Sequence, residues 1–355
     1  MLGRAVAALS IAALGLLLAV GDAHARSKSL IIQLGSQVPS VSALQFYVAE
    51  KAGFFADEDL DLEVRYTANA PTATQIVAAG NADVGLMTNE PIILGYDKGV
   101  RGKMFLVYQQ PLNYYIGIPE DSPIRTIEDL KGKNIGVSNL GSAAVPVVRS
   151  MMRTVNAEAG RDYTLVPVGV LDQAVAALRS NRVAAVAMWE SQYAAFARIG
   201  FQFRYLRHPT LADFGNNGFI ASDQTIKNKP EALCSLGRSV LKALLFIREN
   251  PEAALRIYWT VNPAARAGSD EAASVASGLR EIAYIVNGYR KYKDDQQDYG
   301  RIDRAGFQRY MQMYKDEGAL KEVPPIDDLV TDQFIGCSNK IDAVAVRKLA
   351  RGWKN

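Results

Sequence analysis

The stretch IIQLGSQVPSVSALQFYVAE (residues 31–50) contains a short apolar run, then Leu34-Gly35-Ser36, then residues that favour a helix over 41–53. The same order recurs in NIGVSNLGSAAVPVVRSMM (residues 134–152), where Leu140-Gly141-Ser142 follows the apolar run at an offset of 106 residues. Three common residues are weak support by themselves, so a repeat needs a second match.

A second pair of segments has nearly the same offset. Residues 76–87 read IVAAGNADVGLM and residues 177–188 read ALRSNRVAAVAM, 101 residues apart. Each is a helical pattern that ends at Gly80-Asn81 or Ser180-Asn181, a turn signal, and passes at once into a short apolar strand. Two matches in the same order and at similar spacing predict that the chain contains two similar halves.

Each half is expected to contain strand, turn, helix, strand, helix and strand, which is typical of parallel βαβ units. Thr72-x-x-Gln75 is interpreted as a capping box, and the second half has helices over 143–158 and from Asp172. The pattern predicts an α/β fold of two lobes. The expected strands are residues 30–34, 61–66 and 82–87 in the first half and 134–137, 163–168 and 184–188 in the second.

The composition limits the classes of function. The 355 residues are 49% hydrophobic and 22% charged, which favours two globular domains with sizeable cores. Acidic and basic residues are interspersed, and a net charge of +3 does not give the concentrated basic surface that nucleic-acid binding needs. We therefore expect no nucleic-acid partner.

The first 25 residues have the pattern of a secretory signal peptide. Arg4 supplies the positive region, residues 5–20 the apolar region, and Ala23-His24-Ala25 the small-x-small cleavage site. A retained membrane anchor is the alternative, but the apolar run is short for a span and no stop-transfer cluster follows it. We expect cleavage after Ala25, a mature chain that starts at Arg26, and a soluble product in the periplasm.

Export affects whether the two cysteines, Cys234 and Cys337, are expected to form a disulfide. In an oxidising compartment a long-range disulfide is the preferred interpretation, with two buried free thiols as the alternative. No metal site is expected, because the mature chain has a single histidine, His208, and no C-x-x-C motif. No nucleophile-elbow motif accompanies His208, so we expect a surface or loop position for it.

Ligands of open α/β sheets bind at the carboxyl ends of the strands, where glycine allows close approach and helix N-termini offer N–H groups. Gly35-Ser36 and Gly141-Ser142 have this position, one in each half. A tight turn with a serine N-cap is the alternative interpretation. The chain has no GxGxxG or Walker motif, so no nucleotide is expected and no other cofactor is indicated.

Residues 28–255 also contain, in this order, the segments AEKAGFFADEDLDLEV, AGNADVGLM, TIEDLKGKNIGVSNLGSA and VAAVAMWESQYAAF. Together they resemble the type II periplasmic solute-binding proteins of ABC importers, in particular the NMT1/THI5-like branch with its nitrate, sulfonate, taurine and thiamine-pyrimidine binders. The resemblance implies a monomer of two hinge-linked α/β lobes with a helical C-terminal extension. It also implies an ABC permease in the inner membrane as partner.

On this resemblance, residues 26–115 begin the first lobe, 116–217 form the second, and 218–355 return to the first lobe and add C-terminal helices. The hinge crossings are expected near Tyr114 to Ile118 and near Asn217 to Ala221. Apolar residues at helical spacing continue to the C-terminus. We expect these C-terminal helices to pack on the first lobe and its hinge.

Candidate ligand residues are polar, glycine or aromatic positions expected at the strand ends and hinges. Trp189 offers an apolar platform, although an aromatic side chain just after a strand is as often part of the core. The candidates are Ser36, Gln37, Asn69, Thr72, Asn89 and Glu90 in the first half, Gly141, Ser142, Asp172, Trp189 and Glu190 in the second, and Tyr114 and Asn217 at the hinges.

Glu90 and Glu190 have equivalent places in the two halves, shortly after Met87 and Met188. Their alternative interpretation is a solvated or helix-capping carboxylate. If both face the ligand, they repel a small inorganic anion and hold N–H or cationic donors. The sequence places no arginine at these strand ends. We therefore expect an organic, nitrogen-bearing solute rather than nitrate, with sulfonates bound only through helix N-termini.

Two other classes remain as alternatives. The same fold branch resembles the yeast-type thiamine-pyrimidine synthases, but those enzymes carry a cysteine-rich motif, whereas this chain has two well-separated cysteines. A periplasmic sensor that binds a solute and docks on a receptor is the other alternative. The sequence favours a non-enzymatic solute receptor.

Overall fold

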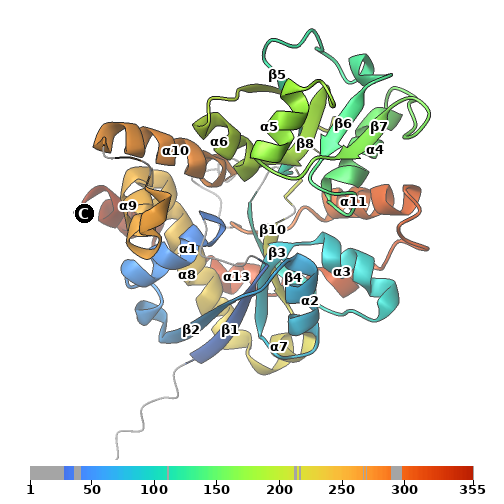
Figure 1. Cartoon of the computed structure of the whole chain (residues 1–355). Coiled ribbons are helices and arrows are strands. Elements are labelled where there is room, and N and C mark those ends of the chain that lie inside the picture. Colours follow the sequence, from blue (N-terminus) through green and yellow to red (C-terminus); the bar gives the residue numbers. More distant parts are fainter. Residues whose placement is uncertain are drawn as a thin grey trace, which may run out of the picture.

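The computed structural model describes residues 28–35, 41–109, 112–211, 214–215, 217–266, 268, 270–288 and 298–354. Within these residues, two five-stranded sheets covered by helices form two lobes, the first below the second in Figure 1. This is the two-lobed α/β architecture that the repeated halves predict.

The first sheet has the strand order β2-β1-β3-β10-β4. Strand β1 is parallel to β2 and β3, whereas β10 is antiparallel to both of its neighbours. Leu30, Ile32 and Leu34 of β1 are buried in one hydrophobic core, and the intervening Ile31 packs against another. The strands are β1 Lys28–Leu34, β2 Leu60–Tyr66, β3 Val84–Thr88, β4 Lys103–Gln109 and β10 Asn217–Ala221.

The second sheet has the order β7-β6-β8-β5-β9. Strand β6 is parallel to β7 and β8, and β5 is antiparallel to β8 and β9. Each strand of the second sheet has the same position and direction as its counterpart in the first sheet. The prediction of two similar halves is therefore confirmed. The strands are β5 Tyr114–Pro119, β6 Asn134–Val137, β7 Thr164–Pro167, β8 Ala185–Trp189 and β9 Phe203–Leu206.

The register of the two sheets corrects the alignment of the halves. Ile32 of β1 pairs with Val84 of β3, and Ile135 of β6 pairs with Ala185 of β8. The first strands are therefore 103 residues apart and the third strands 101. The offset of 106 predicted from the two Leu-Gly-Ser sequences is wrong, because the second sequence lies three residues beyond the matching strand end.

The two glycines of these sequences also differ in what they accommodate. A Cβ atom on Gly35 would lie 2.7 Å from the backbone of Ala70, so this glycine allows helix α2 to approach strand β1. A Cβ atom on Gly141 would meet only the side chain of Asn139, at 3.3 Å. Gly35 is thus explained by packing, whereas Gly141 lies in an open turn.

Six helices of the described residues follow the strands of the two repeats. The capping box predicted at Thr72 is wrong, because α2 begins at Ala70 and Asn69 is its N-cap, accepting a 2.9 Å hydrogen bond from the Thr72 amide. The helix predicted over 143–158 ends at Arg153, before Asn156 with its φ of 54°. The helices are α1 Leu44–Lys51, α2 Ala70–Ala78, α3 Glu90–Gly95, α4 Ala144–Arg153, α5 Asp172–Arg179 and α6 Glu190–Arg198.

The C-terminal helices cover both lobes. Helix α8 packs on α1, α13 and α14 of the first lobe, as expected, but α10 also contacts α6 and α11 contacts α4 of the second lobe. The prediction that this segment packs on the first lobe and hinge is therefore incomplete, because α10 packs on α8, α9 and β4 but also on α6, and α11 reaches α4 (Figure 1). The helices are α7 Asp223–Asn228, α8 Pro230–Glu249, α9 Pro251–Val261, α10 Glu271–Gly288, α11 Arg304–Asp316, α12 Ile326–Leu329, α13 Ile335–Ser338 and α14 Ala343–Arg351.

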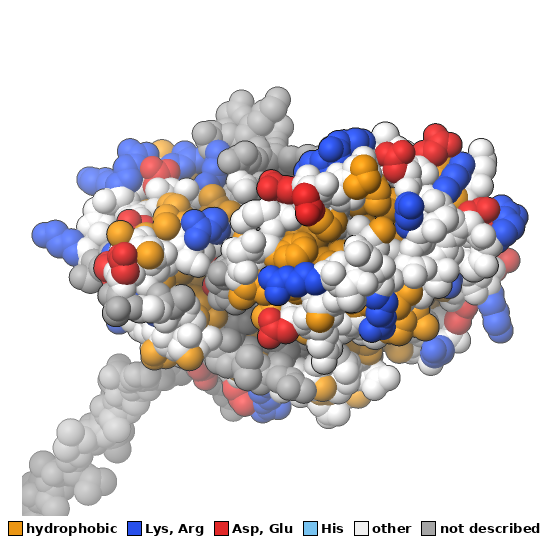
Figure 2. All heavy atoms as spheres, turned by 45° about the horizontal axis from the view of Figure 1, so that its top comes forward, with side chains coloured by type: hydrophobic (Ala, Val, Ile, Leu, Met, Phe, Trp, Pro, Cys, Tyr) orange, Lys and Arg blue, Asp and Glu red, His pale blue; other side chains and the backbone are white. Residues whose placement is uncertain are grey.

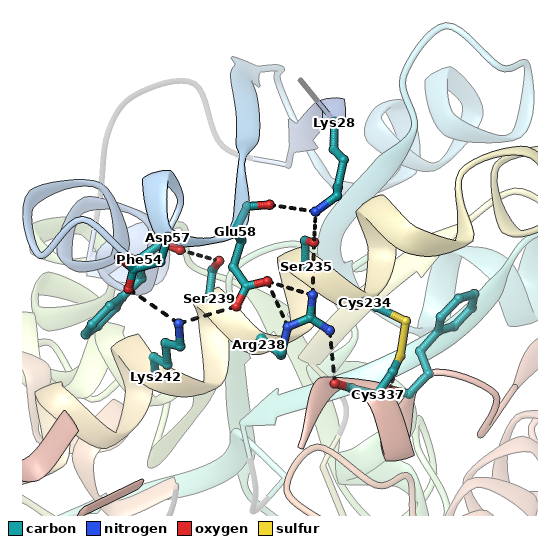
Figure 3. A network of polar contacts seen from close by, with 11 residues as sticks. Lys28, Phe54, Asp57, Glu58, Cys234, Ser235, Arg238, Ser239, Lys242 and Cys337 are labelled. Carbon is teal, nitrogen blue, oxygen red and sulfur yellow. Dashed lines mark hydrogen bonds and ion pairs between the residues drawn. A yellow bond between two sulfur atoms is a disulfide. The ribbon is translucent and has the colours of Figure 1, made fainter. Parts of the chain in front are cut away.

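A disulfide and an ionic network join α8 to the rest of the first lobe (Figure 3). The predicted bond between Cys234 of α8 and Cys337 of α13 is present. Beside it, the Glu58 carboxylate lies 2.6 Å from Arg238 and 3.3 Å from Lys242, and Arg238 also donates to the Cys337 carbonyl. Burial opposes the ionised form of Glu58, but the two cations outweigh burial and lower its pKa.

Basic and acidic side chains are interspersed, with hydrophobic ones exposed between them, on the face shown in Figure 2. In the second lobe the exposed hydrophobic side chains include Leu140, Val170 and Tyr205. Among the helices of the described residues, none combines the length and the apolar character needed to cross a membrane.

Candidate functional site

The carboxyl ends of the central parallel strands of both sheets lie at the boundary between the lobes. Thr88 at the end of β3 pairs with Asn217, the first residue of β10, after the chain has returned from the second lobe. Trp189 at the end of β8 pairs with Tyr114, the first residue of β5, just after the chain has left the first lobe. We call this region, between the ends of β3 and β8, the interlobe boundary.

Glu90 begins helix α3 at this boundary and is 4% exposed. The hydroxyl of Tyr310 in α11 donates a hydrogen bond to its carboxylate, and the Tyr314 hydroxyl lies 3.5 Å from that of Tyr310. Burial, together with the negative charge of Glu90, raises the pKa of the Tyr114 hydroxyl. A carboxylate and three neutral phenols are thus gathered on the first-lobe side of the boundary.

Three buried amide side chains have hydrogen-bonding atoms without a partner among the described residues. Asn89 is 0% exposed, and neither its Oδ1 nor its Nδ2 has a hydrogen-bond partner among the described residues. The same holds for Nε2 of Gln33, in β1, and for Oδ1 of Asn113, just before β5. Buried polar atoms are nearly always paired in proteins, so these amides are candidates to bind a solute.

Glu190 begins helix α6 on the second-lobe side of the boundary. Burial raises the pKa of its carboxyl, and the positive charge of Arg207 opposes that rise. The Arg207 guanidinium lies 4.4 Å from the ring centroid of Tyr115, which is stacked on Tyr193 with 4.8 Å between ring centroids. This side therefore offers a carboxyl group and a guanidinium that lies over a buried aromatic pair.

Arg207 is the residue that sequence reasoning missed, and its position corrects the view that no arginine lies at the strand ends. Strands β9 and β8 are both antiparallel to β5, so they run in the same direction and end at the same edge. Arg207 directly follows β9. The repeat analysis compared only the parallel strands of each half, and so it did not include this edge strand.

Other candidates lie in helix caps and turns. Asn69 accepts hydrogen bonds from the Thr72 amide and hydroxyl, both at 2.9 Å. Ser142 Oγ accepts from the Ala144 amide at 3.2 Å, and the Gly141 amide donates to Asn139 at 2.9 Å. The contacts of Gly141 and Ser142 fit the turn alternative, but the predicted serine N-cap is wrong there, because the N-cap of α4 is Ala143.

The remaining candidates differ in exposure. Asp172 is an exposed residue at the start of α5, Trp189 is half-buried, and Asn217 is buried at the start of β10. Ser36 and Gln37 lie outside the described residues.

His208 lies in a loop, as expected, but it is buried, so the surface alternative is wrong. Its Nδ1 accepts hydrogen bonds from the amides of Thr210 and Leu211, and its Nε2 lies 2.9 Å from Ser150 Oγ. Burial lowers the pKa of His208 to about 4. The residues that the structure describes contain no cluster of three or more side chains fit to hold a metal ion.

The family model described as NMT1/THI5 like matches residues 41–254. The chain is 25% identical over 224 residues to a formylaminopyrimidine-binding protein of Halalkalibacterium halodurans, covering 60% of this chain and 65% of that protein. It is 20% identical over 236 residues to the riboflavin-binding protein RibY of Chloroflexus aurantiacus, covering 66% of each. The matches thus span just under two thirds of the length of these relatives.

Among solved structures, the fold is similar to that of the periplasmic aliphatic sulphonate binding protein SsuA of Escherichia coli, with a TM-score of 0.66. That match covers 86% of this chain and 92% of the other at 16% identity. Such a likeness shows the type II periplasmic binding protein fold alone.

Proposed function

The chain belongs to the NMT1/THI5-like family, and from this membership and its two lobes we propose that it is an exported solute-binding receptor. It captures one small organic solute between its lobes and delivers it to an ABC permease in the inner membrane. The observation that carries the proposal is that β3 and β8 end at the same interlobe boundary, each followed by a glutamate that begins a helix. Cleavage after Ala25, a periplasmic location and a monomeric state are parts of the same proposal.

The side chains at the boundary suggest the chemistry of the solute. Glu190 accepts hydrogen bonds, while Arg207 donates them, and the two lie close enough for the charge of Arg207 to affect the pKa of Glu190. A group with adjacent N–H and C=O functions, such as an amide, a ureide or a pyrimidine edge, complements such a pair. Two relatives named for binding a formylaminopyrimidine and riboflavin support this choice, because both solutes are nitrogen-bearing organic molecules.

We propose that the solute is bound without chemical change. The pair of Ser150 and His208 has the composition of a nucleophile and its base, but two backbone amides donate to His208 Nδ1. The proton of the neutral ring is therefore on Nε2, which then donates to Ser150 and does not accept its proton. This arrangement supports a structural role for the pair.

Isothermal titration calorimetry tests the proposal. The mature protein is titrated with pyrimidines, flavins, ureides, amides, alkanesulfonates and nitrate, and the solutes are recovered and analysed by mass spectrometry. We expect one class of nitrogen-bearing organic solute to bind at one-to-one stoichiometry and to be recovered unchanged. Binding of nitrate or alkanesulfonates alone would contradict the proposed solute chemistry, and recovery of a transformed product would favour an enzyme.

A further inference from the structure

Helix α11 of the C-terminal extension contacts both lobes. Through the Tyr310 hydroxyl it is bonded to Glu90, which follows strand β3 of the first lobe. At the C-terminal end of the helix, its C-cap residue Glu317 lies against Arg149 and Arg153 of α4, which belongs to the second lobe. A single rigid helix therefore connects the first-lobe side of the interlobe boundary to the second lobe.

Buried apolar side chains of α11 and α4 belong to one hydrophobic cluster, and an ionic contact is added where α11 ends. Arg153 Nη2 lies 2.8 Å from Glu317 Oε1, and Arg149 Nη1 lies 3.5 Å from Oε2. Glu317 Oε1 accepts no well-aligned hydrogen bond from the described residues, so the short distance reflects ion pairing. Arg153 also donates to the Asp316 carbonyl at 3.0 Å, in the last turn of α11, where a cation complements the helix dipole.

The burial of Glu317 makes it energetically unfavourable to separate its carboxylate from the two arginines. Its side chain is only 5% exposed, whereas those of Arg149 and Arg153 are 44% and 43% exposed. Burial raises the pKa of Glu317, while Arg153 and Arg149 oppose that rise and Asp316 adds to it. Separating a largely desolvated carboxylate from its cations is unfavourable unless water reaches it at the same time.

We propose that α11 is an interlobe strut that favours the arrangement of the lobes seen in this structure even without a solute. Glu317 with Arg149 and Arg153 forms its latch on the second lobe, and Tyr310 with Glu90 forms its anchor at the solute site. The proposal goes beyond solute binding, since it concerns the equilibrium between arrangements of the lobes in the unliganded protein.

The test measures the distance between the lobes in the unliganded mature protein. Spin labels on noncanonical residues replace two exposed side chains, Asp61 of β2 and Glu128 of the second lobe, and pulsed dipolar spectroscopy gives the distance distribution. We expect Glu317→Gln and Arg153→Ala to change the distribution, so that distances between the labels that are rare in the wild-type protein become common. Arg153→Lys, which keeps the charge, should restore much of the wild-type distribution.

The matched control is Glu322→Gln, because Glu322 pairs at 2.6 Å with Lys315, within the same segment and not across the lobes. It should leave the distribution unchanged. Circular dichroism verifies the folding of each variant. A double variant, Arg149→Ala with Arg153→Ala, changes only partly exposed side chains. It therefore tests the proposal if Glu317→Gln does not fold. A wild-type distribution in Glu317→Gln or, failing that variant, in the double arginine variant would overturn the proposal.

Discussion

The hydroxyl of Tyr310 donates a hydrogen bond to the carboxylate of Glu90, although 220 residues separate them in the sequence. The contact brings helix α11 against the end of β3, at the carboxyl edge of the sheet where we propose that the solute binds. Both side chains are buried, so the hydroxyl replaces water as a donor to the carboxylate. The C-terminal extension is thus part of the candidate site.

We predict that Tyr310→Phe destabilises the protein by about 1–3 kcal/mol, because it removes a donor from a buried carboxylate. Urea unfolding monitored by circular dichroism measures the change in the free energy of unfolding. Tyr108→Phe is the matched control, since Tyr108 is also buried and no hydrogen bond of its hydroxyl is seen within the described residues. Equal effects of the two substitutions would contradict a specific role of the bond to Glu90.

Substitution of Glu90 or Glu190 by glutamine should weaken binding of the solute by about 1–3 kcal/mol, because each change replaces a charged acceptor with a weaker neutral one. Calorimetry measures the affinity, and thermal unfolding verifies the fold. Glu128→Gln, at an exposed position away from the boundary, is the control. Unchanged affinity in both variants would remove the argument for donor groups on the solute and bring sulfonates back into consideration.

His208 predicts a pH dependence of stability. Its pKa is lowered from 6.5 to about 4 in the folded protein, so folding favours the neutral ring. The corresponding stability is complete above pH 6.5 and is lost as the pH falls toward 4, because the unfolded chain then binds the proton more readily. Protonation also turns Nδ1 from an acceptor into a donor that faces two amides.

Comparison with His208→Asn isolates this effect, because asparagine keeps an acceptor but does not titrate. The difference in unfolding free energy between the wild type and the variant should shrink or reverse between pH of about 7.5 and about 5. A difference that is independent of pH would contradict a neutral buried His208.

Replacing Cys234 and Cys337 by alanine should destabilise the protein by about 2–5 kcal/mol, because the bond closes a long loop in the unfolded chain. The two cysteines are 103 residues apart. Unfolding in urea gives the loss, and alkylation of the unfolded, unreduced protein followed by mass spectrometry checks the bond. Two alkylated thiols in the wild-type protein would contradict it.

Local patterns were sufficient to predict the two α/β halves. Strands β3 and β8 each follow a helix and a turn directly, so the signals that predict them lie close together in the sequence. The two Leu-Gly-Ser sequences were aligned wrongly. The second one lies three residues after the end of β6, whereas the first begins at the last residue of β1, and no local pattern marks where β6 ends. Register is set by pairing across the sheet, as between Ile135 and Ala185.

The remaining site residues depend on contacts between distant parts of the chain. Tyr310 lies in an ordinary amphipathic helix and Glu317 is its C-cap. The amphipathic pattern predicts that one helix face is buried but does not say against which lobe. Arg207 is next to an edge strand whose direction follows from its antiparallel pairing with β5. Neither tertiary relationship can be read from local spacing.

Capture of a solute between the lobes is tested most directly by tryptophan fluorescence and thermal unfolding with the solute found by calorimetry. Trp189 ends β8 at the interlobe boundary, whereas Trp259 lies in α9 and Trp353 packs on Phe246 of α8. We predict a saturable one-to-one fluorescence change that Trp189→Phe largely abolishes. The solute should also stabilise the wild-type protein by about 2.7 kcal/mol at about a hundredfold excess over Kd. Stabilisation with an undiminished signal in Trp189→Phe would contradict binding between the lobes.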